Sequence, residues 1–303
     1  MPEPGAGEAR VRVLGCALCG SDMRVWRNGW PITPGHEIVG VVEHPGHALD
    51  GQRIVVYIPV FCRRCDDCAR GDTHLCVTNS SLVGWQRDGG YAEYLLVPDQ
   101  CLVPIPDDIE TELAPLLLDV IGTPAHGIRL AKRIIQAGDV AVIGAGPIGL
   151  GGIVAAQNLG FDNVYVAEPQ EPRLAAARTI GAKALPENNA RRYPLVLETS
   201  GSNAGRQRAL ELIAAHGVCV FLGESDRWDV EETRAIRRKD FFILRSFYFP
   251  LSEFADNLAM LRADEERYRY FVDELAPLDD LQRLSEAFSA GKLIKPQVAP
   301  MKG

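Results

Sequence analysis

Residues 140–152 read VAVIGAGPIGLGG, and they join an apolar run to a helix-like run at residues 150–159. The apolar run predicts a strand, so the glycines lie at a strand-to-helix turn. In this Gly-x-Gly-x-x-Gly pattern, Gly144 permits the tight turn, Gly146 lets the backbone approach a pyrophosphate, and Gly149 lets helix and strand pack closely. The stretch predicts a dinucleotide-binding turn, although glycine-rich turns between strands and helices are also common elsewhere.

The residues around the turn indicate which dinucleotide is bound. Pro147 and Ile148 are candidate cofactor contacts within the glycine pattern, and the N-terminus of the following helix offers free N–H groups and a positive dipole end to phosphates. Glu168 ends the next predicted strand, about twenty residues beyond the glycines, where a carboxylate accepts hydrogen bonds from the ribose hydroxyls of NAD. That carboxylate would repel the 2′-phosphate of NADP, and the nearest following base, Arg173, is five residues further on. The pattern therefore favours NAD.

The rest of the chain divides into two kinds of pattern. From residue 139 strands and helices alternate, which is typical of a doubly wound parallel sheet with right-handed crossovers. Further strands are predicted at 163–168, 195–199, 218–222 and 242–249, with a helix at 206–215. The first third is instead β-rich with Gly and Pro turns, which favours a small barrel or folded sheet. We expect an α/β chain with a separate β-rich domain.

Composition excludes several classes of partner. The 303 residues are 47% hydrophobic and 24% charged, with a formal net charge of −8, which disfavours nucleic acid and anionic membranes. The first ten residues, MPEPGAGEAR, hold no apolar segment, so we expect no secretory signal and a cytoplasmic protein. The uncharged window 140–161 is long enough to span a bilayer, but its six glycines fit the nucleotide turn better.

Four of the eight cysteines form the pattern Cys-x2-Cys-x2-Cys-x7-Cys, at Cys62, Cys65, Cys68 and Cys76. Four thiolates can close a tetrahedral shell around one zinc ion and leave no open position, so this ion would be structural. An iron–sulfur cluster also uses four cysteines and is the alternative. Free core cysteines do not fit, because charged residues stand between the thiols.

A second set of candidate ligands has a different chemistry. Cys19 and His36 each lie in a glycine-containing loop, and Glu37 follows His36 directly. Each residue alone is more typical of a core cysteine or a surface histidine. Together they make a mixed sulfur, nitrogen and oxygen set, which suits a zinc ion that keeps one position open for catalysis.

Together these residues resemble the zinc-dependent medium-chain dehydrogenase/reductase family, which includes alcohol, polyol and threonine dehydrogenases. The resemblance covers nearly the whole chain, and the four-cysteine lobe carries it most specifically. The other matching segments are PEPGAGE at 2–8, CGSD at 19–22, GHE at 35–37, GGYAEY at 89–94 and GKLIKP at 291–296.

The resemblance implies a GroES-like catalytic domain (residues 1–120), a Rossmann domain (121–250) and a return to the catalytic domain (251–303). It implies Asp119 as third ligand of the catalytic zinc and Thr123 beside the nicotinamide. Two zinc ions per chain are expected. The alcohol would occupy the open zinc position, where its pKa falls from the ~16 of bulk water toward ~7, as for zinc-bound water. Ser21 would accept the hydroxyl proton, and hydride would pass to NAD.

The chain departs from the family at two places. It begins at the proline-rich segment, without the hairpin that usually comes earlier, so we expect a sheet edge that is exposed or is covered by another segment or subunit. The family often has a proton-relaying histidine where this chain has Arg24. Because guanidinium keeps its proton, we expect Arg24 either to hold an anion of the cofactor or substrate, or to face solvent. Trp30 and Trp85 are candidates to line the pocket or to pack structurally.

Three functions remain open. The first is an NAD-dependent zinc dehydrogenase acting on a small secondary alcohol, a polyol or an amino-polyol, or on the matching ketone. The second is a zinc-free quinone or enoyl reductase of the same fold, which usually lacks the cysteine lobe. The third is a non-catalytic relative that keeps the structural zinc and acts as a binding protein. A homo-oligomer, dimer or tetramer, is expected by family analogy.

Overall fold

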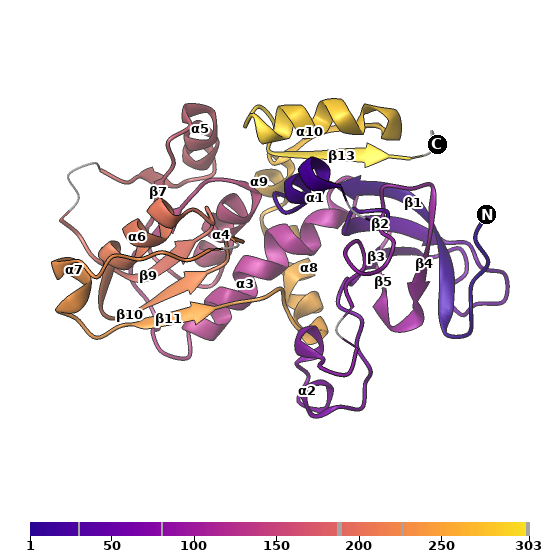
Figure 1. The fold of residues 1–303 in the computed structure, drawn as a ribbon, viewed down its shortest axis with the longest axis horizontal. Helices are drawn as coiled ribbons and strands as arrows, with labels where there is room; N and C mark the ends of the chain where they lie inside the picture. Colours follow the sequence, from indigo (N-terminus) through magenta and orange to yellow (C-terminus); the bar gives the residue numbers. More distant parts are fainter. Residues whose placement is uncertain (30, 80, 187–189, 226, 301–303) are drawn as a thin grey trace. The chain divides into compact units, whose positions relative to one another are not determined.

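The computed structural model describes residues 1–29, 31–79, 81–186, 190–225 and 227–300 (Figure 1). The chain forms two compact units. Unit 1 holds Met1–Leu118, Pro250–Phe254 and Tyr268–Gly303, and unit 2 holds Asp119–Phe249 and Ala255–Arg267. The segment Ala255–Arg267, which the sequence analysis placed in the returning part, thus groups with unit 2.

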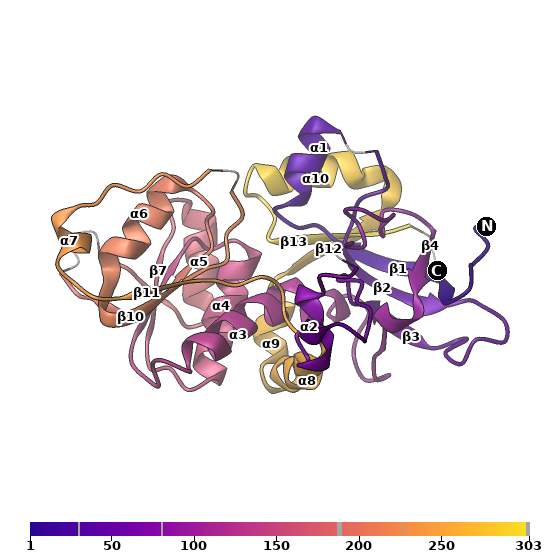
Figure 2. The ribbon, with the colours of Figure 1, turned by 60° about the horizontal axis from the view of Figure 1, so that its bottom comes forward.

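Unit 1 is built on a seven-stranded sheet with the order β12-β13-β1-β2-β3-β5, in which β4 also pairs with β1. Its strands are β1 (Glu8–Ala17), β2 (Glu37–Val42), β3 (Arg53–Val56), β4 (Tyr94–Pro98), β5 (Leu102–Pro104), β12 (Val272–Pro277) and β13 (Lys295–Ala299). Its helical segments include α1 (Asp22–Asn28), α2 (Asp66–Ala69), the 3₁₀ turns η1 (Thr73–Leu75) and η3 (Ala114–Leu117), and α10 (Leu281–Ser289). In Figure 2, α10 runs along β13, on which it packs.

The alternation of β1 explains its place in that sheet. From Glu8 to Val13 every second residue is buried, so one face of the strand meets the core while the other is partly solvated. β1 pairs antiparallel with β2, and a bulge between Val13 and Gly15 shifts the register. After the bulge Ala17 lies opposite Glu37. The loops that follow β1 and precede β2 therefore meet at one sheet end.

Unit 2 confirms the predicted doubly wound sheet. Its six strands run in the order β11-β10-β9-β6-β7-β8 and all pairs are parallel. They are β6 (Val140–Ile143), β7 (Val164–Ala167), β8 (Lys183–Ala184), β9 (Tyr193–Glu198), β10 (Ile213–Phe221) and β11 (Phe242–Arg245). The helices are α3 (Asp119–Ala131), α4 (Pro147–Asn158), α5 (Glu171–Thr179), α6 (Asn203–Leu212) and α7 (Arg234–Arg237), with α8 (Phe254–Ala263) and α9 (Glu265–Arg269) further along. The strand order reverses between β6 and β9, and such a point is where open parallel sheets bind ligands.

Two predicted boundaries in unit 2 are wrong. The predicted helix 206–215 ends at Leu212, and Ile213 already belongs to β10. Ile213 lies opposite Tyr193 of β9 and both side chains are fully buried, so sheet pairing overrides the helical pattern there. The predicted strand 242–249 ends at Arg245.

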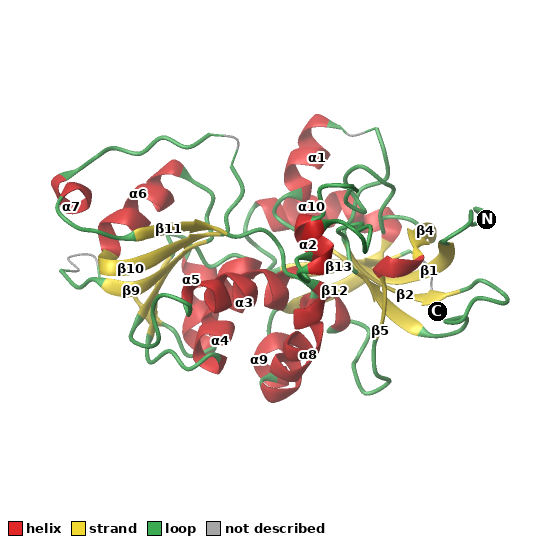
Figure 3. Ribbon diagram, turned by 90° about the horizontal axis from the view of Figure 1, so that it is seen from below, coloured by secondary structure: helices red, strands yellow, loops and turns green. Residues whose placement is uncertain are grey.

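The central strands of unit 2 form its core. Ala141, Ile143, Val196 and Phe221 pack with residues of α6 in one buried cluster. Figure 3 distinguishes the helices, strands and loops by colour.

None of the helices that the structure describes is both long and apolar enough to cross a bilayer. The apolar window 140–161 is instead divided between β6, the glycine turn and α4.

Candidate functional site

The four-cysteine lobe brings its thiols together. The Sγ atoms of Cys62, Cys65, Cys68 and Cys76 all lie within 4.8 Å of one another. The Sγ atoms of Cys62 and Cys68 are 4.0 Å apart, and those of Cys65 and Cys76 are 3.8 Å apart. A tetrahedral zinc ion with bonds of ~2.3 Å places its sulfur ligands about 3.8 Å from each other. The lobe therefore has the dimensions of a four-thiolate zinc site.

These thiols differ in pKa. Hydrogen bonding by the backbone of Arg64 lowers the pKa of the Cys62 thiol to about 6. Burial, followed by hydrogen bonding with Cys65 and Cys76, raises the pKa of Cys68 to about 12. Four adjacent thiolates repel one another, so all four are ionised together only when a cation lies between them.

The mixed set is assembled where β1 and β2 pair. Cys19 lies two residues beyond the end of β1, His36 immediately precedes β2, and Glu37 is the first residue of β2. One ligand atom from each of the three lies within 4.8 Å of the others. His36 is 2% exposed and Glu37 is fully buried. A thiolate, an imidazole and a carboxylate so close together form the kind of donor set that zinc prefers.

Asp22, which the sequence analysis gave no role, organises this set. One carboxylate oxygen, Oδ1, lies 3.1 Å from His36 Nδ1. The other, Oδ2, accepts hydrogen bonds from the Cys19 backbone N–H at 2.9 Å and from the Tyr91 hydroxyl at 2.7 Å. Burial raises the pKa of Asp22, but the charge and hydrogen bond of His36 and the hydrogen bonds of Cys19 and Tyr91 outweigh it and hold the pKa below its usual value. An acid that holds Nδ1 leaves Nε2 as the ligand atom, as in carboxylate–histidine–zinc arrangements.

Glu37 also has a partner that the sequence did not reveal. The ammonium group of Lys295, on β13, forms an ion pair with Glu37 Oε1, and both side chains are fully buried. Lys295 belongs to the GKLIKP segment, so the C-terminal strand supplies the counter-charge for an acid beside the metal ligands. The sequence signal was an unexplained lysine in an otherwise buried strand.

The other predicted residues of unit 1 lie close to this set. Ser21 directly precedes α1 and Arg24 lies within it. The guanidinium of Arg24 lies over the Trp85 ring, 5.3 Å from its centroid, and the same ring is 5.7 Å from that of His36. Trp85 is buried and contacts both Arg24 and His36. Trp30 lies outside the described residues.

The glycine turn of unit 2 has the geometry of a dinucleotide site. Gly144 has a φ of +95°, which permits the tight turn. A Cβ on Gly146 would meet open space, so the backbone is accessible to a pyrophosphate. A Cβ on Gly149 would lie 2.1 Å from Gly144 O, so only glycine allows this helix–strand contact. Pro147 and Ile148 are the first two residues of α4, which begins three residues before the predicted helix-like run 150–159.

Glu168 lies at this turn. Its Oε2 accepts the Ala145 N–H at 2.7 Å and its Oε1 accepts the Gln170 N–H at 2.9 Å. Each oxygen has a second lone pair to accept a hydroxyl. Arg173 lies in the first half of α5 and is half-buried, and Thr123 is half-buried in α3. Asp119 is the buried first residue of α3.

Comparison with known proteins agrees with this geometry. Residues 5–107 match the family model of the alcohol dehydrogenase GroES-like domain. The chain is 33% identical over 224 residues to L-threonine 3-dehydrogenase of Chelativorans sp. (strain BNC1). The aligned region covers 70% of this chain and 64% of that relative. The chain belongs to the zinc-dependent medium-chain dehydrogenase/reductase family. It spans 64% of the length of this relative.

Solved structures of the family share the fold. A zinc-binding dehydrogenase of Sinorhizobium meliloti 1021, solved bound to NADP, is 26% identical, with a TM-score of 0.84 over 99% of this chain and 94% of that one. A thermostable alcohol dehydrogenase from Pyrobaculum aerophilum is also 26% identical, with a TM-score of 0.87 over 99% and 93%. Unit 1 thus carries the GroES-like fold of the family, and unit 2 carries its Rossmann fold.

Proposed function

We propose that the protein is a zinc-dependent dehydrogenase that transfers hydride between a small secondary alcohol, polyol or amino-polyol and NAD. The observation that carries this proposal is the set of half-buried Cys19 and buried His36 and Glu37, with Asp22 holding the imidazole. Three protein ligands of mixed chemistry and one open position are typical of catalytic zinc sites, whereas a four-thiolate shell is closed.

Asp119 is the proposed third ligand of the catalytic zinc. It occupies the family position for that ligand, and a carboxylate is a suitable donor. η3 packs on β1 and β2, and the chain leaves unit 1 directly after it, at Leu118. The chain therefore leaves unit 1 next to the strand pair whose β2 begins at Glu37, directly after His36. Thr123, one helical turn later, is proposed to contact the nicotinamide.

The residues have separate tasks in this proposal. When bound, zinc acts as a Lewis acid that lowers the pKa of an alcohol, and NAD accepts hydride. Cys19 and His36 hold the ion, while Asp22 fixes the imidazole. Ser21, next to Asp22 at the start of α1, accepts the hydroxyl proton of the substrate and passes its own proton on to water or to the cofactor ribose. In unit 2 the turn at Gly144, Gly146 and Gly149 holds the pyrophosphate.

Relatives narrow the substrate class. The 33% identical relative is named for L-threonine, an amino acid with a secondary hydroxyl group. An acidic third ligand agrees with the polyol, amino-polyol or threonine branch. We propose that 3-hydroxy amino acids and polyols are the first substrates to examine.

Zinc analysis of the purified chain tests the proposal and separates it from its alternatives. The wild type is expected to hold two zinc ions, one in each donor set. Cys19→Ser and Cys65→Ser are each expected to lose one, because removal of a thiolate breaks a single site. One zinc in the wild type favours the non-catalytic relative, and none favours the zinc-free reductase.

Glu168 is expected to set the preference for NAD over NADP. Glu168→Ala removes the acceptors for the ribose hydroxyls and the repulsion of a 2′-phosphate, so the KM for NAD should rise about 10-fold while that for NADP falls. Initial rates with both cofactors measure this. Glu171→Gln, on the exposed side of α5, is the control and should change neither KM. A solved structure that this chain resembles was determined with NADP bound, so the cofactor preference of this chain has to be measured. Faster turnover of the wild type with NADP than with NAD would refute the proposed role of Glu168.

Arg24 is proposed to hold an anionic group of the substrate or the cofactor pyrophosphate. Its guanidinium lies on Trp85, next to the ring of a metal ligand, and so stands at the rim of the mixed set. Arg24→Gln is expected to raise one KM about 10-fold at little cost in kcat, since a contact equal in ground and transition states is lost. A rise for NAD identifies the pyrophosphate, and a rise for the alcohol identifies the substrate. Unchanged values of both would leave Arg24 as a solvent-facing residue.

The proposed assembly is a homo-oligomer through the Rossmann unit. β11 is an edge strand of the parallel sheet, and Phe242 and Ile243 on it are 49% and 43% exposed. An apolar edge with unpaired backbone groups suits pairing with a second copy. None of the eight cysteines forms a disulfide in the structure, which agrees with a proposed location in the reducing cytoplasm.

A further inference from the structure

A fully buried carboxylate lies at the ligand-binding edge of the parallel sheet and has no part in the chemistry proposed above. Glu198 is the last residue of β9, the strand beside β6, and none of its side chain is exposed. An isolated charge in such a place costs several kcal/mol, so its bonds have to compensate for the lost hydration.

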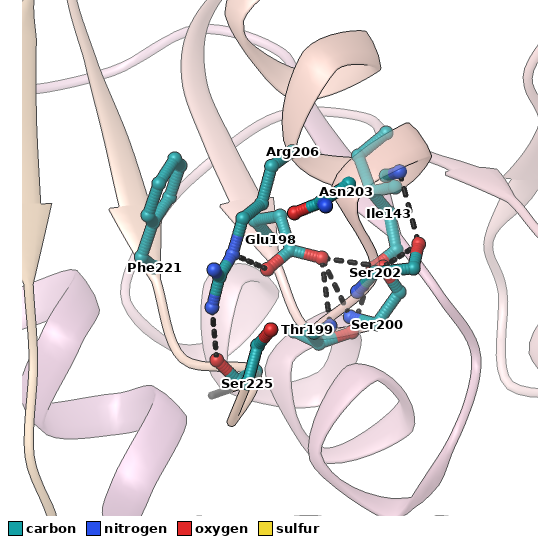
Figure 4. A network of polar contacts seen from close by, with 12 residues as sticks. Ile143, Glu198, Thr199, Ser200, Ser202, Asn203, Arg206, Phe221 and Ser225 are labelled. Atoms are coloured by element: carbon teal, nitrogen blue, oxygen red, sulfur yellow. Dashed lines mark hydrogen bonds and ion pairs between the residues drawn. The ribbon is translucent and has the colours of Figure 1, made fainter. Parts of the chain in front are cut away.

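One oxygen of Glu198 organises the turn that follows β9. Its Oε1 accepts hydrogen bonds from the Ser200 N–H at 2.8 Å, the Ser200 hydroxyl at 2.5 Å and the Gly201 N–H at 3.0 Å. Figure 4 shows the carboxylate between this serine turn and the guanidinium of Arg206. Ser202 continues the turn, because its hydroxyl accepts the Gly205 N–H and caps α6.

The other oxygen balances its charge against Arg206. Glu198 Oε2 lies 3.7 Å from Arg206 Nε, and Arg206 is 6% exposed. The guanidinium donates to Gly223 O at 3.1 Å and to Arg227 O at 3.0 Å, and it lies over the Phe221 ring. The pair therefore connects the loop after β9 to the loop after β10.

The same segment holds the glycine turn. Thr199 donates from its backbone N–H and its hydroxyl to Ile143 O, both at 2.9 Å, and from its hydroxyl to Gly144 O at 3.0 Å. A Cβ on Gly144 would lie 3.1 Å from Ser200 N. The position of the glycine turn thus depends on residues that Glu198 fixes.

We propose that Glu198 is a positioning residue for the dinucleotide: with Arg206 it fixes the loops after β9 and β10, and through Thr199 it holds the glycine turn in its binding geometry. This inference rests on the proposed function for the identity of the ligand. It explains why a charge, rather than an apolar side chain that would pack at lower cost, occupies this buried place.

Glu198→Gln tests the inference, because it keeps the shape and removes the charge. The affinity for NADH, measured by its fluorescence, is expected to fall about 10- to 100-fold, since a small displacement of a binding turn is costly. The KM for the alcohol and the zinc content should not change. Glu211→Gln, a half-buried glutamate on α6, is the matched control and should keep the wild-type affinity.

Hydrogen exchange provides a readout that needs no ligand. Amides of the turn at 144–149 are expected to exchange faster in Glu198→Gln than in the wild type. If the single variant does not fold, the double variant Glu198→Gln/Arg206→Met removes the unpaired cation and carries the same expectations.

The inference would be overturned if Glu198→Gln, measured well below its unfolding temperature, exchanged the amides of the turn and bound NADH as the wild type does. Glu198 would then be a stabilising residue only. A wild type that does not bind NADH would refute the proposed function, while the exchange result would still decide whether Glu198 positions the turn.

Discussion

Cys19→Ser is expected to lower kcat/KM for alcohol oxidation by about 1000-fold or more, because the Lewis acid that lowers the pKa of the alcohol contributes several kcal/mol to transition-state stabilisation. Serine is a poor zinc ligand at neutral pH, so the mixed set loses its thiolate and the ion that depends on it. Steady-state rates of NADH formation measure the loss.

Two further measurements show whether that loss is specific. NADH affinity should stay at the wild-type value, because the glycine turn belongs to unit 2 while Cys19 belongs to unit 1. Cys101→Ala, a buried cysteine outside both donor sets, should keep its activity. Wild-type activity in Cys19→Ser, with its zinc content reduced, would show that the mixed set is not catalytic.

Lys295→Met is expected to destabilise unit 1 by about 3–5 kcal/mol, because it leaves the fully buried carboxylate of Glu37 without its counter-charge. The two residues belong to β13 and β2, so the pair also connects the C-terminal strand to the metal-binding part of the sheet. Chemical unfolding followed by tryptophan fluorescence measures the change.

The matched control is Lys292→Met, which removes an exposed lysine three residues earlier and should alter stability by less than about 0.5 kcal/mol. The double variant Glu37→Gln/Lys295→Met should recover part of the loss, since no unpaired charge remains. Equal stability of Lys295→Met and Lys292→Met would contradict the importance of the buried pair.

Much of this molecule could be predicted from short-range patterns. The Gly-x-Gly-x-x-Gly turn and the alternation of strands and helices predicted the parallel sheet, because both depend on neighbours in the sequence. The cysteine spacing predicted the four-thiolate lobe, since its ligands lie within fifteen residues. The β1–β2 pairing that brings Cys19 to His36 is a local antiparallel contact as well.

The unpredicted features depend on contacts between distant segments. Asp22 meets Tyr91, and Lys295 meets Glu37, across separations of 69 and 258 residues. The end of the predicted helix at residue 215 was wrong for a related reason, because Ile213 pairs with β9, and only the folded sheet reveals that partner. Glu198 could have been suspected as an acid at the end of a buried strand, but its partner Arg206 lies on a helix face that the pattern does not orient.

The central claim is that the mixed donor set and the glycine turn serve hydride transfer between an alcohol and NAD. Its most direct test is the change in nicotinamide absorbance when the zinc-loaded chain is mixed with NAD or NADP and a panel of secondary alcohols, polyols and 3-hydroxy amino acids. We expect at least one member to be oxidised, faster with NAD than with NADP. A chain that holds both zinc ions and reduces neither cofactor with any member would contradict the claim.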